Sequence, residues 1–161
     1  MLQWLTTTQA GRLLLTLLIS AVPVVELRGG IPYGIARDLN PWLAFAASVV
    51  GNMLPVPFIL LFIRKILHWM KRYPRLGKIA RNLESRAAKK SAGVRKSELI
   101  GLCLLVAVPL PGTGAWTGAL VAALMEMRLK RAIPTIFAGV LIAGLLVTLA
   151  CTGVQALRFL V

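Results

Sequence analysis

Acidic residues, histidine and cysteine are all scarce in this sequence. Its 161 residues include five Asp or Glu, one His and two Cys. No pair of carboxylates, Ser/His/Asp set, phosphate-binding loop or cluster of metal ligands stands out. Cys103 and Cys151 lie in apolar runs without CxxC spacing, which argues against a disulfide framework or a metal site. We therefore predict that the protein is not an enzyme and binds no metal or cofactor.

What the sequence does contain is apolar residues and positive charge. It is 58% hydrophobic and carries a formal net charge of +14. A soluble domain of this size could not bury so much apolar surface, and a disordered or nucleic-acid-binding chain would be far less apolar. Both properties fit a chain whose apolar residues face lipid while its cations face an anionic membrane surface. We predict a single membrane domain over residues 1–161, with no nucleic-acid partner.

Two apolar stretches are long enough to cross a membrane as helices. Trp42–Ile63 and Ala132–Leu157 both exceed the roughly 20 residues that a hydrocarbon core of about 30 Å requires. Asn40-Pro41 is a good start for the first helix, because Asn caps a helix and Pro suits its first position. Pro55, inside the first stretch, predicts a kink there.

Two other apolar stretches are too short to cross. Leu13–Val25 and Leu99–Pro111 have 13 residues each, which is about 20 Å of helix. After each break the chain becomes apolar again, so we predict two re-entrant helical hairpins. The alternative, a single kinked span over Leu99–Met125, would put the cations of Arg128–Arg131 on the opposite side from the basic block of Arg64–Lys96. The positive-inside rule therefore favours the hairpin.

The two halves of the chain resemble each other. Ile19–Pro23 is similar to Leu105–Pro109, and each half ends in a long span. A hairpin followed by one crossing, when repeated, inverts the second copy, an arrangement common in secondary transporters.

Between the halves, apolar residues at helical spacing among many cations predict a basic amphipathic helix on the cytoplasmic leaflet. The predicted units are a first repeat (1–63), a basic cytoplasmic segment (64–97) and a second repeat (98–161).

Glu26 and Arg28 carry the clearest functional signal, because charges inside a membrane segment cost about 2.5–3.5 kcal/mol each even on mild scales. One interpretation is a mutual ion pair that fixes the hairpin tip around a break at Pro23 and Gly29-Gly30. The other gives both residues a role in transport. The Arg28 fork suits a phosphate or carboxylate, and Glu26 would carry a coupling proton.

The run Pro109–Gly114 is the second signal, since two prolines and two glycines in six residues cannot form a helix interior. It is either a tight turn or part of a substrate site. Helix N-termini after Gly30 and Gly114 would add positive partial charge to the same cavity. The predicted substrate-binding residues are Glu26, Arg28, Gly29, Gly30, Pro111, Gly112, Thr113, Gly114, Trp116 and Thr117, with Glu26 as the proton-coupling residue.

The segments Ala21–Pro32 and Ala107–Gly118 resemble those of the putative small multidrug export proteins, and this resemblance implies export. The hairpin plan more distantly resembles the DedA superfamily of lipid transporters, which implies two opposed re-entrant hairpins and transport of undecaprenyl phosphate or another lipid. Gly114 stands where that superfamily places an arginine, and Arg28 would then supply the charge.

These observations lead to one preferred function and two alternatives. The preferred function is proton-coupled flipping of an amphiphilic anion such as undecaprenyl phosphate in the bacterial inner membrane, by a multi-pass protein of DedA-like architecture. The alternatives are an exporter of cationic drugs and a non-transporting membrane scaffold. The expected partners are membrane lipids, with anionic lipid at the basic face, and the sequence is compatible with a homodimer.

Overall fold

A computed structural model describes residues 6–70, 95–110 and 112–158 of the chain, and these residues form helices joined by short turns. The amphipathic helix predicted in the basic segment falls mainly on residues 71–94 and, like Pro111, lies outside the described residues. The helices are α2 (Gln9–Ala21), α3 (Glu26–Ala36), α4 (Pro41–Met53), α5 (Val56–Met70), α7 (Arg95–Ala107), α8 (Ala115–Leu124) and α9 (Leu129–Arg158).

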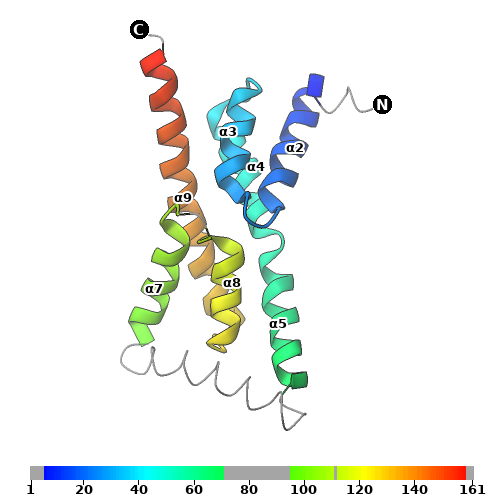
Figure 1. Cartoon of the computed structure of the whole chain (residues 1–161), viewed down its shortest axis with the longest axis vertical. Helices are drawn as coiled ribbons and strands as arrows, with labels where there is room; N and C mark the ends of the chain where they lie inside the picture. The colour runs from blue at the N-terminus through cyan, green and yellow to red at the C-terminus, as the bar shows by residue number, and fades with distance from the viewer. Residues whose placement is uncertain (1–5, 71–94, 111, 159–161) are drawn as a thin grey trace.

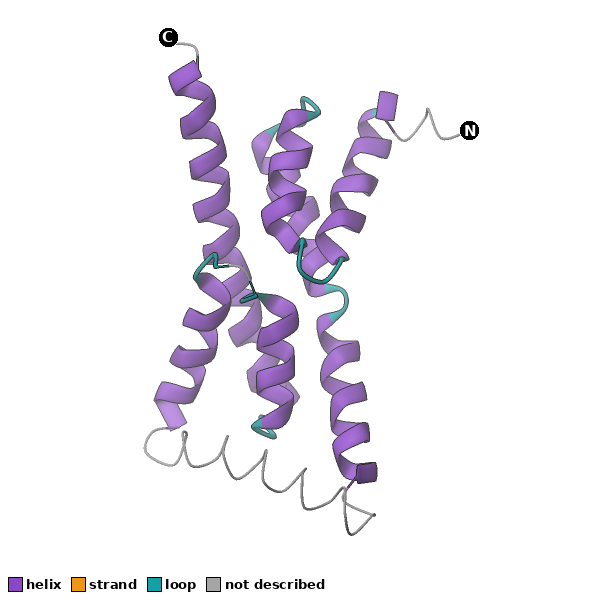
Figure 2. Cartoon of the chain, viewed as in Figure 1, coloured by secondary structure: helices purple, strands orange, loops and turns teal. Residues whose placement is uncertain are grey.

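The helices are arranged in two tiers along the long axis of the molecule (Figure 1). α2, α3 and α4 pack on one another in the upper tier, while α5, α7 and α8 occupy the lower tier and α9 runs along both. Two helical hairpins, α2–α3 and α7–α8, enter from opposite ends, and their turns lie near mid-height (Figure 2). The described part of α7–α8 returns to the end of the molecule at which it starts.

Two apolar helices are long enough to cross a membrane. They cover Pro41–Trp69 and Leu129–Val154, and only 33% and 39% of their most apolar windows are buried. Most of this apolar surface therefore faces outward, unlike that of a core helix in a soluble protein, and a lipid environment accounts for it. The chain is a helical membrane protein, and the sequence prediction of long helices at Trp42–Ile63 and Ala132–Leu157 is confirmed.

The first long helix is interrupted where the sequence predicts a kink. The Asn40 side chain accepts a hydrogen bond of 2.9 Å from the Trp42 N–H and so caps α4, with Pro41 in its first turn. α4 ends at Met53 and α5 begins at Val56. The interruption includes Pro55, whose missing N–H cannot continue the helical hydrogen bonds.

The first hairpin turns at Pro23, one of the two breaks that the sequence predicts, and not at the other. A break at Gly29-Gly30, with a helix starting after Gly30, is wrong, because the turn lies between Ala21 and Glu26 and both glycines are inside α3. The physical reason is close packing: a Cβ on Gly30 would overlap the Ser20 hydroxyl of α2. Gly30 thus serves the approach of neighbouring helices, as its GxxxG spacing with Gly34 also suggests.

Candidate functional site at the hairpin tips

Glu26 begins α3 and reaches across to the second hairpin. Its backbone has a positive φ of 50°, and its side chain is only 4% exposed. The carboxylate accepts a hydrogen bond of 3.3 Å from the Trp116 N–H, and the N–H of Ala115 also interacts with it. Since α8 begins at Ala115 and no side chain from its own cap residue, Gly114, bonds to it, Glu26 acts as the N-cap of α8 from another helix.

Gly114 makes this approach possible. Its φ of 150° and ψ of −163° fall in a region that is nearly exclusive to glycine. A Cβ at this position would overlap the Glu26 carboxylate. The backbone therefore needs glycine here for two separate reasons, its own conformation and the space that the carboxylate takes. The predicted helix start after Gly114 is confirmed.

Arg28, two residues after Glu26, binds the turn that precedes α8. Its Nη2 donates to both the backbone oxygen and the Oγ1 of Thr113, the latter at 2.9 Å, and to the Val108 oxygen at 3.3 Å. All three acceptors are uncharged, so the turn supplies no counter-ion. The Nε of Arg28 is buried without a hydrogen-bond partner in the described part of the chain.

The second hairpin also reaches back to the first. The indole Nε1 of Trp116 donates to the Ala21 oxygen at the end of α2, at 3.2 Å. The two hairpin tips are therefore joined crosswise by Glu26, Arg28 and Trp116. We call this arrangement the tip junction.

The turn of the second hairpin is ordered by its own threonines. Thr113 Oγ1 donates to the Val108 and Leu110 oxygens, each at 2.8 Å, and Thr117 Oγ1 donates to the Gly112 oxygen at 2.9 Å. Gly112 has a φ of 84° and open space around its missing Cβ. These bonds hold Thr113 in a position where its two oxygens accept hydrogen bonds from the Arg28 guanidinium.

The structure brings together most, but not all, of the predicted site residues. Glu26, Arg28, Thr113, Gly114 and Trp116 meet at the tip junction, and Gly112 and Thr117 shape its turn. Gly29 and Gly30 lie outside it, because the space beside Gly29 is taken by the first hairpin and the space beside Gly30 by the hydroxyls of Ser20 and Ser48. Each charged residue bonds to the opposite hairpin, and Glu26 and Arg28 also attract each other electrostatically, as in the mutual ion pair considered from the sequence.

Sequence reasoning missed the buried polar residues above the tip junction. Thr16 and Ser20 of α2 and Ser48 of α4 are completely buried, as is Asn52, for which the sequence suggested only a kink or a polar wall. The sequence does contain a signal for them: Thr16 and Ser20, like Ser48 and Asn52, are four residues apart in an apolar helix. This spacing places the two residues of each pair on one face of the helix.

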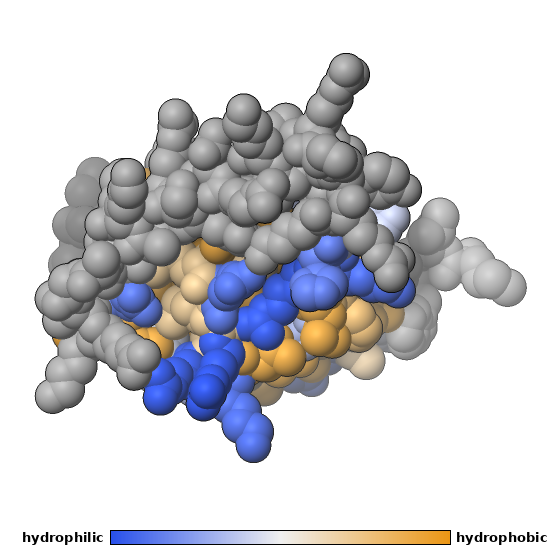
Figure 3. All heavy atoms as spheres, turned by 90° about the horizontal axis from the view of Figure 1, so that it is seen from below, coloured by the Kyte–Doolittle hydropathy of each residue, from blue (hydrophilic) through white to orange (hydrophobic). Residues whose placement is uncertain are grey.

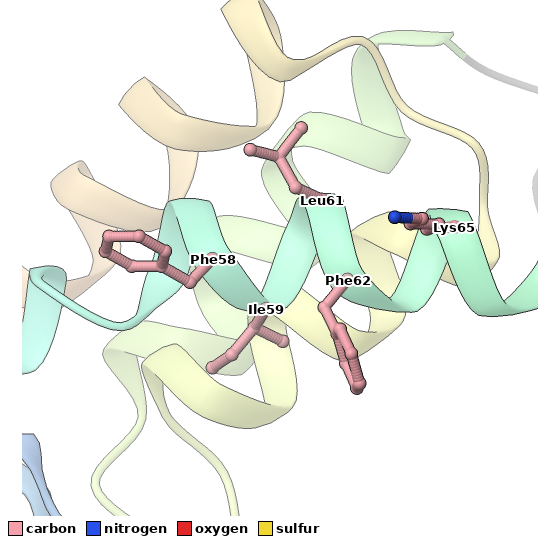
Figure 4. A pocket seen from close by; sticks show the side chains of 5 residues that line it. All are labelled: Phe58, Ile59, Leu61, Phe62 and Lys65. Carbon is pink, nitrogen blue, oxygen red and sulfur yellow. The ribbon is translucent and has the colours of Figure 1, made fainter.

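Among the hollows that lie away from the tip junction, two differ clearly in character. An apolar hollow of about 440 Å³ is lined by α5 alone, through Phe58, Ile59, Leu61, Phe62 and Lys65, and is therefore an outer surface of that helix (Figure 4). A second, polar hollow of about 320 Å³ lies at the lower end, where Glu98, Glu126, Arg128 and Arg131 are among its lining residues. Figure 3 looks onto this end and shows hydrophilic side chains beside apolar ones.

Comparison with known proteins gives one family. Residues 26–146 match the model of a family described as "putative small multi-drug export protein". The match covers about three quarters of the chain and includes all the described residues of the tip junction except Ala21. No curated protein and no solved structure matches the chain. Because the family model covers well over half of its length, the chain belongs to the family of putative small multi-drug export proteins.

Proposed function

We propose that this protein is a proton-coupled transporter of an amphiphilic anion, such as undecaprenyl phosphate, in the bacterial inner membrane. In this proposal α2–α3 and α7–α8 are re-entrant hairpins of an inverted repeat, an architecture like that of the DedA superfamily. The observation that carries the proposal is the tip junction, where Glu26 and Arg28 meet the opposite hairpin near mid-height. Transport sites of inverted-repeat transporters occupy this place, between broken helices at the membrane midplane.

The chemistry of the tip junction favours an anionic substrate. The N-terminus of α8 and the Arg28 guanidinium both attract negative charge, and in this structure the carboxylate at that helix end is Glu26. Protonation would remove the negative charge of Glu26 and weaken its hold on α8. The N–H groups and the planar guanidinium would then be available to a phosphate headgroup. Loss of the proton would restore the carboxylate, which would displace the headgroup. Movement of the proton would in this way be coupled to movement of the substrate.

The outer surface of the protein suits a lipid substrate. The apolar hollow on α5 offers Phe58 and Phe62 to a hydrocarbon chain, with Lys65 at one end (Figure 4). A prenyl chain could remain in lipid beside such a surface while the headgroup crosses between the hairpin tips. We further propose that the basic segment, residues 64–97, faces the cytoplasm and attracts anionic lipid, and that the protein is compatible with a homodimer.

The test is transport by purified protein in proteoliposomes, with a fluorescent short-chain polyprenyl phosphate as the probe. Arg28→Ala should abolish its flipping, whereas Arg28→Lys keeps the charge but loses the planar fork and should retain part of it. Arg37→Ala removes a positive charge just beyond the other end of α3 and is the matched control, which should flip the probe normally. Normal flipping by folded Arg28→Ala would overturn the proposed mechanism.

A second candidate is export of cationic compounds, which the family description favours. Among the described residues, Glu26 is the one charged side chain that is buried, and it could bind a cation. In this case Glu26→Gln should abolish ethidium efflux from the same vesicles, while Arg28→Ala should preserve or increase it by removing a repulsive charge. A protein that moves neither probe would instead fit a membrane scaffold.

A further inference from the structure

Ser48 and Asn52 form a buried polar pair on α4 with no partner. Both are completely buried, and Ser48 Oγ, Asn52 Oδ1 and Asn52 Nδ2 make no hydrogen bond in the described part of the chain. The other buried hydroxyls behave differently, because Thr16, Ser20 and Thr148 each donate to the backbone oxygen four residues earlier, at 2.8 Å. An unsatisfied buried polar group costs about 1–3 kcal/mol, so this pair points to a polar guest.

The pair lies on the route to Glu26. A Cβ on Gly30 would overlap the Ser20 hydroxyl and lie 2.9 Å from Ser48 Oγ, so the hydroxyls of α2 and α4 converge on one point of α3. α3 and α4 run in opposite directions (Figure 1). One helical turn toward the tip from this point therefore reaches Glu26 on α3 and Asn52 on α4, at the same level.

Polar groups continue from this pair toward the upper end of the molecule. One turn above Gly30, a Cβ on Gly34 would lie 3.1 Å from Thr16 Oγ1. One further turn along α2 is Arg12, whose Nη1 donates to the Arg37 oxygen at 2.6 Å, beside the exposed end of α3. Each layer of the α2–α4 bundle from this end to the tip junction thus contains at least one polar group.

We infer that Ser48 and Asn52 bind water inside the α2–α4 bundle, and that this water carries protons between Glu26 and the end of the molecule where Arg12 and Arg37 lie. The inference rests on the proposed role of Glu26 in proton coupling and adds the path by which the proton arrives. Each delivery moves one proton from a hydronium ion to a carboxylate oxygen of Glu26 and leaves a water molecule, so no other reactant is needed. An Asn side chain suits this task because its amide both donates to and accepts from water.

The experiment measures hydrogen–deuterium exchange of the Glu26 carboxyl in vesicles without any substrate. At acidic pH, the infrared C=O band of the protonated carboxyl is assigned by its absence in Glu26→Gln, and its shift is followed after mixing with D₂O. Asn52→Leu replaces the amide by an apolar group of similar size and should slow the exchange about tenfold or more. A tenfold slower rate corresponds to an activation barrier that is about 1.4 kcal/mol higher. Ser48→Ala, a smaller change that is safer for folding, should slow it in the same direction.

Thr148→Ala is the matched control, because its hydroxyl is also buried and already bonded within its own helix, α9, outside the α2–α4 bundle; its exchange rate should stay at the wild-type value. An unchanged rate in folded Asn52→Leu and Ser48→Ala would overturn the water path, and so would bound Na⁺ or K⁺ found at the pair with exchange unaffected. Since no substrate is present, these results do not depend on flipping of the polyprenyl phosphate, and the path and the proposed function can fail separately.

Discussion

Glu26 holds a position that a Ser, Asp or Asn usually fills at the start of a helix, but it does so from a different hairpin. The carboxylate therefore joins two elements that are far apart in the sequence, and its charge state affects both. Arg28 and Trp116 add bonds across the same gap. At this scale, stability and the proposed transport step depend on the same few atoms.

Replacing Glu26 should separate these two roles. Glu26→Gln keeps an oxygen that can accept from the Trp116 N–H, so the apparent melting temperature in detergent should change little. Glu26→Ala leaves the first N–H groups of α8 without their cap and should cost about 1–3 kcal/mol. Thermal unfolding of both variants measures the difference. Equal destabilisation by Gln and Ala would mean that the negative charge, and not the hydrogen bond, holds α8.

Gly114→Ala should be much more harmful than Gly112→Ala. Both glycines have positive φ, which costs a residue with a Cβ about 1–2 kcal/mol, but only at Gly114 would the Cβ also overlap Glu26. We expect Gly112→Ala to lower the melting temperature slightly and Gly114→Ala to lower it several times more. In a Glu26→Ala background the extra loss at Gly114 should shrink. If it persists there, the clash with the carboxylate is not its cause.

At the scale of elements, the sequence predicted the helices well and one turn only in part. The lengths of Trp42–Ile63 and Leu99–Pro111 reflect simple geometry, so a long helix and a short one followed from counting residues. The turn at residues 22–25 contains Pro23, a predicted break, but the second predicted break at Gly29-Gly30 was wrong. Glycine serves both turns and close packing, and only neighbours in space decide between them. Gly30 faces Ser20 and Ser48, which the sequence alone could not place beside it.

Gly51 tests the packing of α2 on α4. A Cβ there would overlap the backbone oxygen of Leu17, which cannot rotate away as a side chain could. Gly51→Ala should therefore destabilise the protein by about 1–3 kcal/mol through overpacking. Gly153→Ala, in α9 with nothing within 4 Å of its Cβ, should be neutral or slightly stabilising, because Ala favours a helix. Equal melting temperatures for the two variants would contradict the close approach of α2 and α4.

At the scale of the whole molecule, the end that includes the start of α9 exposes a group of cations. The end where α5 stops and α9 starts exposes Lys65, Arg128 and Lys130, and the sequence placed these cations on one side from the positive-inside rule. The sequence analysis put Glu26 and Arg28 in one site with residues of the second hairpin, but the hydrogen bonds that join them could not be predicted. The bonds of the tip junction join residues that are 80 to 95 positions apart in the sequence. Neither the spacing nor the composition of the sequence shows that these residues lie in contact.

Membrane topology gives the last prediction. In a background of Cys103→Ser and Cys151→Ser, single cysteines are introduced by Lys65→Cys, Lys130→Cys and Asp38→Cys, all at exposed positions. If α7–α8 is re-entrant, the first two cysteines should react with a membrane-impermeant maleimide only from the cytoplasmic side, and the third only from the opposite side. A single crossing over Leu99–Met125 would instead make position 130 react together with position 38. That result would exclude the re-entrant second hairpin, and the midplane transport site would lose one of its two halves.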